Sequence, residues 1–194
     1  MPRTWIFGYG SLINRASVRH TLSDEAVGEI VPGRISGWRR SWSNRVVARG
    51  RTGLGAREES GGRINGVAIE LLDPDFAALD RREAGYVRVL VQDQTLVDGD
   101  LWLYTKPDGA PASAAFPVAL SYLECVLHGC LAFGRDFASE FLTETPGLVA
   151  LWNDRAAPVY PRRVPLTAAA TAEVDALLHA HLPEAVTRPL RRSE

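Results

Sequence analysis

Short apolar runs separated by turn signals fill the first half of the chain, and helically spaced leucines open the second half. Residues 4–7 form a β-prone apolar run that stops at a glycine loop, after which Asn14 is placed to cap a brief helix through Val18. Segment 44–62 carries glycine and arginine with little periodicity, which predicts a long loop or irregular hairpin. The other segments rich in β-forming residues, all predicted strands, are 30–42, 64–72, 86–91 and 101–104.

Helix signals become frequent after residue 72. The run Asp73-Pro74-Asp75 is typical of a helix start, and the helix should extend from Pro74 to about Glu83, with Gly85 as its stop. Shorter helices are expected at 137–142 and 172–182. A longer one should bury a single face built from Leu120, Leu123, Leu127 and Leu131.

This order of elements predicts the fold class and the domain count. Strands mostly precede helices and no repeat is present, so we predict an α+β fold. The length suits a single domain over residues 1–188, and the charged segment 189–194 is expected to be a disordered tail.

Composition indicates the class of protein and the compartment in which it is found. A hydrophobic fraction of 46%, a charged fraction of 23% and a formal charge of −1 indicate an ordinary globular protein with no general attraction to nucleic acid or membranes. No run of eighteen apolar residues occurs, and the apolar start is too short for a signal peptide. Cys125 and Cys130 fall on one predicted helix and point apart, which fits a reducing compartment. We therefore expect a soluble, cytoplasmic protein.

The loop Gly8-Tyr9-Gly10-Ser11-Leu12 is the most unusual local feature. Two glycines at a strand end allow consecutive backbone amides to turn toward a bound carboxylate or phosphate. A dinucleotide fingerprint would need glycine where Ile13 stands, a Walker loop is absent, and Ser11 does not lie in a nucleophile elbow. On spacing alone, an ordinary tight turn and a ligand-binding loop remain equal interpretations.

Glu83 is the second candidate for chemistry. It falls in the last turn of its predicted helix, where the negative end of the helix dipole favours the protonated form of a carboxyl group. A group that must take a proton from an ammonium and later return it benefits from such a position. By position alone, however, a solvated helix end with Arg81 and Arg82 as its cations is the favoured interpretation.

Two further patterns have simpler explanations. The spacing of Cys125, His128 and Cys130 resembles a metal site, but no fourth ligand is near and core packing is favoured. Arginines gather in segment 34–63 with Trp38 between them, which suggests a nucleic-acid stripe. Because strands alternate faces, these arginines should be scattered, and one or two would equally meet an anionic substrate.

Four segments together resemble a known family. Residues 7–13 (FGYGSLI) resemble the N-terminal signature of the γ-glutamylcyclotransferase superfamily, particularly its ChaC-like, glutathione-degrading branch, and AIG2-like members belong to the same group. Residues 79–86 (LDRREAGY) look like the segment with the catalytic glutamate and a following tyrosine, and 37–42 (GWRRSW) like the strand between. Residues 121–129 resemble a helix that carries an active-site tyrosine in other branches.

The resemblance implies a mixed, mostly antiparallel small β-barrel with helices outside, and an enzyme that needs no cofactor and no metal. It implies that Glu83 is the acid/base in the release of 5-oxoproline from a γ-glutamyl compound by attack of the α-amine on the γ-carbonyl. The substrate-binding residues that it implies are Tyr9, Gly10, Ser11, Leu12, Tyr86 and Tyr122.

Several points remain open at this stage. The substrate can be glutathione, a γ-glutamyl amino acid or a γ-glutamylamine, and the oligomeric state is undetermined. The partner expected is the small γ-glutamyl substrate, without nucleic acid or membrane. Two alternatives stand beside the enzyme: a module of the same fold that binds a carboxylate without turnover, and an arginine-rich nucleic-acid binder.

Overall fold

The computed structural model describes residues 2–74, 76–106 and 109–182. The chain forms two compact units, residues 1–39 with 56–107 and residues 40–55 with 108–194. Two long strands have residues in both units, and every other element belongs to one of them.

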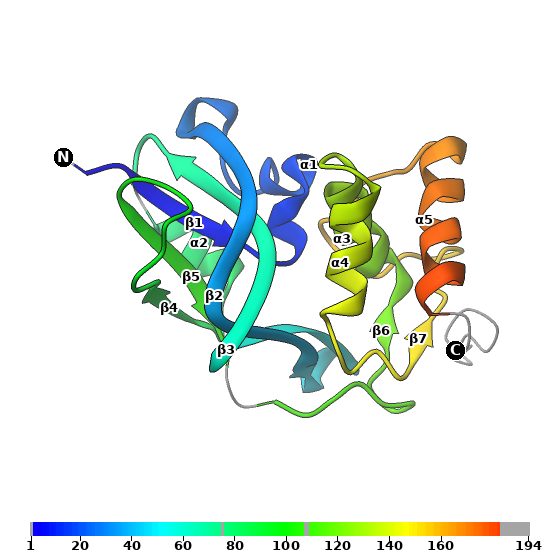
Figure 1. Ribbon diagram of the computed structural model, residues 1–194. Helices are drawn as coiled ribbons and strands as arrows, with labels where there is room; N and C mark the ends of the chain where they lie inside the picture. The colour runs from blue at the N-terminus through cyan, green and yellow to red at the C-terminus, as the bar shows by residue number, and fades with distance from the viewer. Residues whose placement is uncertain (1, 75, 107–108, 183–194) are drawn as a thin grey trace. The chain divides into compact units, whose positions relative to one another are not determined.

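A five-stranded sheet is the framework that holds the first unit together. Its strands are β1 (Thr4–Gly8), β2 (Val27–Val46), β3 (Arg51–Leu71), β4 (Val87–Leu90) and β5 (Asp100–Thr105). The order across the sheet is β2-β3-β1-β5-β4 (Figure 1). Strand β1 runs antiparallel to β3 and parallel to β5, whereas β4 runs antiparallel to β5. The sheet is therefore mixed and mostly antiparallel.

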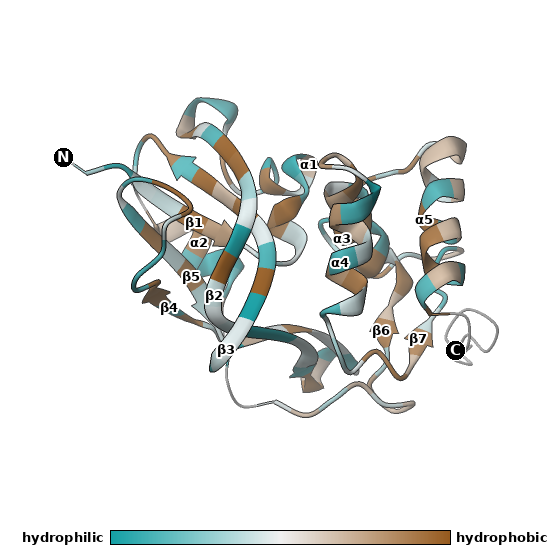
Figure 2. Ribbon diagram, viewed as in Figure 1, coloured by the Kyte–Doolittle hydropathy of each residue, from teal (hydrophilic) through white to brown (hydrophobic). Residues whose placement is uncertain are grey.

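The core of the first unit lies where β1 and β3 pair. Trp5, Ile6 and Phe7 are all buried, and Ile6 faces Ile69 in the register of the antiparallel ladder. Consecutive buried residues mean that β1 is covered on both faces, which explains why its sequence is an apolar run without alternation. By contrast, β2 and β3 show apolar and polar bands in turn along their length (Figure 2).

Short helical elements connect these strands. The 3-10 turn η1 (Ser11–Ile13) and helix α1 (Arg15–Val18) follow β1, and the side chain of Asn14 caps α1 by accepting from the amides of Ala16 and Ser17. This confirms the predicted cap and the predicted helix through Val18. A second 3-10 turn, η2 (Asp24–Ala26), leads into β2, and helix α2 (Ala77–Arg82) lies between β3 and β4.

The second unit is mainly helical. Its elements besides the ends of β2 and β3 are η3 (Val47–Arg49), β6 (Val118–Ala119), α3 (Leu120–Leu131), α4 (Arg135–Thr143), β7 (Leu151–Trp152) and α5 (Ala168–His181). The three helices contact one another (Figure 1). Leu120, Leu123 and Leu127 are buried as the spacing predicts, whereas Leu131 is only partly covered.

The structure corrects two expectations and decides between two others. Of the two forms expected for segment 44–62, the hairpin is the one observed, because β2 continues to Val46, β3 begins at Arg51 and the two strands are neighbours in the sheet. Helix α2 begins at Ala77 rather than Pro74. Among the described residues the sheet has β2 and β4 as its edges, so the barrel that the resemblance implied is not closed. The α+β class is confirmed, and the expected tail at 189–194 lies outside the described residues.

Candidate active site

The glycine loop forms a single tight turn at the end of β1. The amide of Ile13 donates to the carbonyl of Gly10 at 2.9 Å, so η1 begins directly after Gly10. Ser11 and Leu12 are the first two residues of this turn. Amides at the start of a helical turn have no carbonyl of the same turn before them to donate to. A Cβ on Gly8 would lie 2.7 Å from the Cβ of Leu12. Gly8 is therefore required for space, since its φ is not in the left-handed region.

Helix α2 delivers Glu83 to its C-terminal end. Glu83 is the residue that caps the helix, with its amide donating to the carbonyl of Leu79 at 2.8 Å. Gly85 follows with a φ of +92°, and the amide of Tyr86 donates back to the carbonyl of Glu83 at 2.9 Å. This confirms Gly85 as the helix stop. The Glu83 side chain is 17% exposed, so its carboxylate is largely enclosed yet still reaches solvent.

Arg82 is buried, which corrects its interpretation as a solvated cation at the helix end. Its side chain is only 1% exposed. The guanidinium donates from Nε to Oε1 of Glu83 at 3.1 Å and from Nη2 to Oγ of Ser11 at 3.0 Å. One guanidinium thus holds a residue of the glycine loop and the candidate acid/base together. Arg81, its neighbour, is exposed as expected.

A chain of hydrogen bonds ties the loop to α2 by a second route. The Tyr9 hydroxyl donates to the carbonyl of Tyr104 at 2.6 Å, and the Tyr104 hydroxyl donates to Oδ1 of Asp80 at 2.5 Å. Burial, together with the Asp80 carboxylate, raises the pKa of Tyr104. Arg88 completes the chain by donating to both carboxylate oxygens of Asp80, at 2.9 and 3.1 Å. The Tyr9 side chain therefore has a structural partner, and its contact with substrate stays a prediction.

Lys106 is a candidate substrate-binding residue that the sequence analysis did not identify. Its Nζ lies 6.0 Å from the centre of the Tyr86 ring, and 3.9 Å from where a Cβ on Gly85 would stand. The ammonium is thus placed beside Gly85 and Tyr86, where it adds a positive charge near one predicted site residue. Its signal in the sequence was that it is the only lysine of the chain.

Tyr122 lies in the second unit, on α3, whereas the other predicted site residues are in the first. Its ring stands edge-on to Trp42 with centroids 5.8 Å apart, and tilted against Tyr160 at 4.9 Å. A Cβ on Gly53 would be 3.9 Å from Cε1 of Tyr122. Tyr122 is thus part of an aromatic cluster of its own unit, and its contact with substrate stays a prediction.

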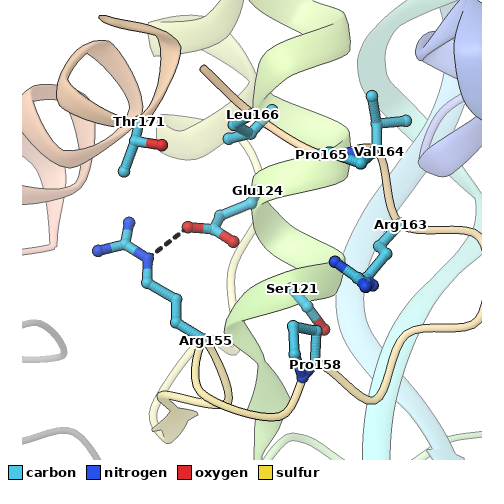
Figure 3. A pocket seen from close by; sticks show the side chains of 9 residues that line it. All are labelled: Ser121, Glu124, Arg155, Pro158, Arg163, Val164, Pro165, Leu166 and Thr171. Atoms are coloured by element: carbon cyan, nitrogen blue, oxygen red, sulfur yellow. Dashed lines mark hydrogen bonds and ion pairs between the residues drawn. The ribbon is translucent and has the colours of Figure 1, made fainter. Parts of the chain in front are cut away.

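The second unit also contains a pocket of about 210 Å³ that includes none of the predicted site residues (Figure 3). Glu124 and Arg155 both line it, and Nε of Arg155 donates to Oε1 of Glu124 at 2.6 Å. Arg155 also pairs with Asp175. Burial raises the pKa of the Glu124 carboxyl, against the opposing effect of Arg155. Buried contacts of Ser121 with Asp154 hold one wall. The two ion pairs of Arg155 link the segment after β7 to α3 and to α5.

In the described parts of the chain, no three His, Cys, Asp or Glu side chains are placed together to hold a metal ion. Cys125 and Cys130 are both buried and unbridged. Burial raises the pKa of the Cys130 thiol to about 12. Nor does any helix within the described ranges have the length and apolarity needed to span a membrane.

Several arginines of segment 34–63 have partners within the chain, two of them at the surface and two more deeply placed. Arg39 and Arg57 both pair with Glu59. Arg40 is fully buried, with its Nε donating to Oγ1 of Thr145 at 2.7 Å, and Arg51 donates to the carbonyl of Val159 at 2.8 Å. Four arginines of this segment are therefore occupied by contacts within the protein.

Comparison with known proteins places this arrangement in a family. The chain is similar over 89% of its length to a solved "Gamma-glutamyl cyclotransferase", with 15% identity, a TM-score of 0.54 and 98% of that chain covered. An uncharacterised protein of Homo sapiens shows 13% identity and a TM-score of 0.52, over 88% of this chain and 97% of the other. YkqA from Bacillus subtilis shows 16% identity and a TM-score of 0.54, over 70% and 51%. At these identities the likeness shows the fold alone.

No curated protein matches the chain. The family model described as "Gamma-glutamyl cyclotransferase, AIG2-like" matches residues 6–118, which is more than half of the chain and includes both the glycine loop and Glu83. The chain therefore belongs to the AIG2-like γ-glutamyl cyclotransferase family.

Proposed function

We propose that this protein is a γ-glutamylcyclotransferase that releases 5-oxoproline from a γ-glutamyl compound. The single observation that carries the proposal is Glu83: a carboxylate enclosed at a helix end, oriented by a buried arginine and linked through it to the glycine loop. Membership of the family supports the reaction class. Glutathione, a γ-glutamyl amino acid and a γ-glutamylamine all fit this class.

The proposed reaction is an internal exchange of one amide bond for another. Glu83 takes a proton from the α-ammonium of the substrate, and the freed amine attacks the γ-carbonyl carbon. A bond forms between the α-nitrogen and the γ-carbon, which closes the five-membered ring. Glu83 returns that proton to the leaving nitrogen as the bond from the γ-carbon to this nitrogen breaks. The ring nitrogen gives up its second proton to the released amine, which departs as an ammonium and leaves the neutral lactam. The balance needs no water, metal or redox partner.

The loop supplies the second element of the proposed mechanism. The amides of Ser11 and Leu12 are suited to hold an oxygen of the γ-glutamyl group, either at its α-carboxylate or at its γ-carbonyl. Lys106 beside Tyr86 offers a positive charge for a substrate carboxylate in the same unit.

The test is release of 5-oxoproline from a panel of glutathione, γ-glutamyl amino acids and γ-glutamylamines, with and without the Glu83→Gln substitution. This change keeps size and hydrogen bonding but removes the group that carries the proton. We expect kcat to fall by about a hundred- to ten-thousand-fold, with KM much less affected. The matched control is Glu58→Gln, the same chemical change at an exposed residue of β3.

Three outcomes distinguish the candidate functions. Loss of release with unchanged thermal midpoint supports the enzyme. Near-normal release by a folded Glu83→Gln protein overturns the mechanism. Saturable binding of γ-glutamyl compounds by the wild type without any 5-oxoproline identifies instead a binding module of the same fold. The nucleic-acid alternative is disfavoured by the engaged arginines and would show as salt-dependent binding to DNA or RNA.

A further inference from the structure

Arg82 is a charged residue in a place where charges are costly, at the junction of three elements of the first unit. Its side chain is 1% exposed, although it follows an exposed arginine at the end of a short helix. A guanidinium that is taken out of water needs its donors satisfied, and its position then becomes fixed by the partners that satisfy them. Its contacts form two groups. Nη1 and Nη2 bind neutral oxygens, which we call the anchoring side, and Nε faces Glu83.

The anchoring side binds Ser17 on α1, Thr21 just after α1, and Ser11 on η1. Nη1 donates to the carbonyl of Ser17 at 2.8 Å and to Oγ1 of Thr21 at 2.9 Å. Nη2 donates to Oγ of Ser17 at 3.0 Å and to Oγ of Ser11 at 3.0 Å. Ser17 is itself fully buried. Four neutral oxygens therefore hold the planar group from one side.

The remaining nitrogen, Nε, faces Glu83. It donates to Oε1 at 3.1 Å, and Glu83 is the one carboxylate among the described residues that forms an ion pair with Arg82. Adjacent residues on a helix do not normally face each other. This contact forms because Glu83 has already left helical geometry, with φ −98° and ψ 27° at the cap.

We infer that Arg82 is the positioning residue of the acid/base, and this inference rests on the proposed function. Arg82 fixes the direction of the Glu83 carboxylate relative to the glycine loop. Its Nε lies 3.1 Å from Oε1 of Glu83, so the carboxylate is held in one orientation in the resting enzyme. In the proposed reaction this is the group that takes the proton of the α-ammonium. The hold of Arg82 on Ser11 keeps the loop in register with that base.

The first experiment compares wild type with Arg82→Met, Arg82→Lys and the control Arg81→Met. Methionine keeps much of the length of the arginine stem but removes charge and donors. We expect Arg82→Met to lower kcat by about ten- to a hundredfold, as a small misplacement of a reacting group does, with KM changed much less. The acid limb of the kcat/KM profile should move to higher pH. Arg82→Lys should restore part of kcat and the position of that limb, and Arg81→Met should match wild type.

The second experiment does not touch Arg82 or Glu83. Thr21→Val removes the hydroxyl that accepts from Nη1 while keeping the volume of the side chain, so the protein should fold. If Arg82 is held in place from the anchoring side, kcat falls in Thr21→Val while KM is maintained. A merely structural role predicts a lower thermal midpoint with unchanged kcat and pH profile.

A double mutant separates this inference from the proposed function. On the Glu83→Gln background, Arg82→Met should cause no further loss of 5-oxoproline release, because its effect passes through the missing carboxylate. A wild-type pH profile in folded Arg82→Met or Thr21→Val, with Glu83→Gln inactive, overturns the role of Arg82 and leaves the proposed function standing. Absence of release by the wild type on every substrate overturns the proposed function itself.

Discussion

Gly8→Ala tests whether the glycine loop depends on close packing. Gly8 ends β1, and an added methyl group would lie 2.7 Å from Cβ and 3.1 Å from the backbone carbon of Leu12, which is itself buried. The backbone contact belongs to η1 and cannot rotate away, so either the turn or the strand end must shift. Overpacking of this kind costs about 1–3 kcal/mol.

The expected effect is measurable by thermal unfolding. For a chain of this size, each kcal/mol corresponds to roughly 2–4 °C, so the thermal midpoint of Gly8→Ala should fall by about 2–12 °C. Because η1 also carries Ser11, which accepts from Arg82, release of 5-oxoproline should fall as well.

Gly53→Ala is the matched control. Gly53 lies in β3, its φ is not left-handed, and an added Cβ would meet its nearest atoms at 3.9 Å, an ordinary contact. Its midpoint should be unchanged or slightly raised, since alanine restricts the unfolded chain. Equal midpoints for Gly8→Ala and Gly53→Ala would refute the packing argument.

Two further predictions concern ionisation. The Arg3 guanidinium and the amide of Glu29 lower the pKa of Glu70 from 4.5 to about 2, so this carboxylate contributes stability above pH 4.5 that is lost as the pH falls toward 2. Glu70→Gln should therefore lose less stability than wild type over that interval, measured by denaturant unfolding at each pH, and parallel curves would contradict the assignment. Burial raises the pKa of Cys130 to about 12, so iodoacetamide at neutral pH should leave this thiol unmodified in the native protein and alkylate it after denaturation, as read by mass spectrometry. Rapid native labelling would show that the thiol is accessible.

Much of the fold followed from local patterns. The cap at Asn14, the stop at Gly85 and the buried face of α3 each depend on residues within a few positions of one another, so sequence spacing reveals them. For segment 44–62 the sequence left a long loop and an irregular hairpin as alternatives, and it did not show that β2 and β3 extend so far into the segment. Pairing of backbone groups maintains a strand even where glycine and arginine interrupt the alternation, and periodicity cannot report it.

The residues of the candidate site also differ in whether the local sequence reveals them. The glycine loop and Glu83 stood out as short motifs. The burial of Arg82 depends on Ser17 and Thr21, which are 65 and 61 residues away in the sequence. Such a contact has no local signal, and a charged residue at a helix end ordinarily predicts exposure. The two-residue strands β6 and β7 are likewise too short to leave a pattern.

The division of the β2–β3 hairpin between the two units affects how the chain is made. Residues 40–55 belong with 108–194, and buried Arg40 is 105 residues from its partner Thr145. At a ribosomal rate of about 5–20 residues per second, roughly 5–20 s pass before that partner emerges. Trp42 and Leu54, both buried in the finished protein, lack part of their cover during this interval. The nascent chain therefore leaves these two apolar side chains incompletely covered until residues 108–194 follow, so this part of the hairpin completes its packing late in translation.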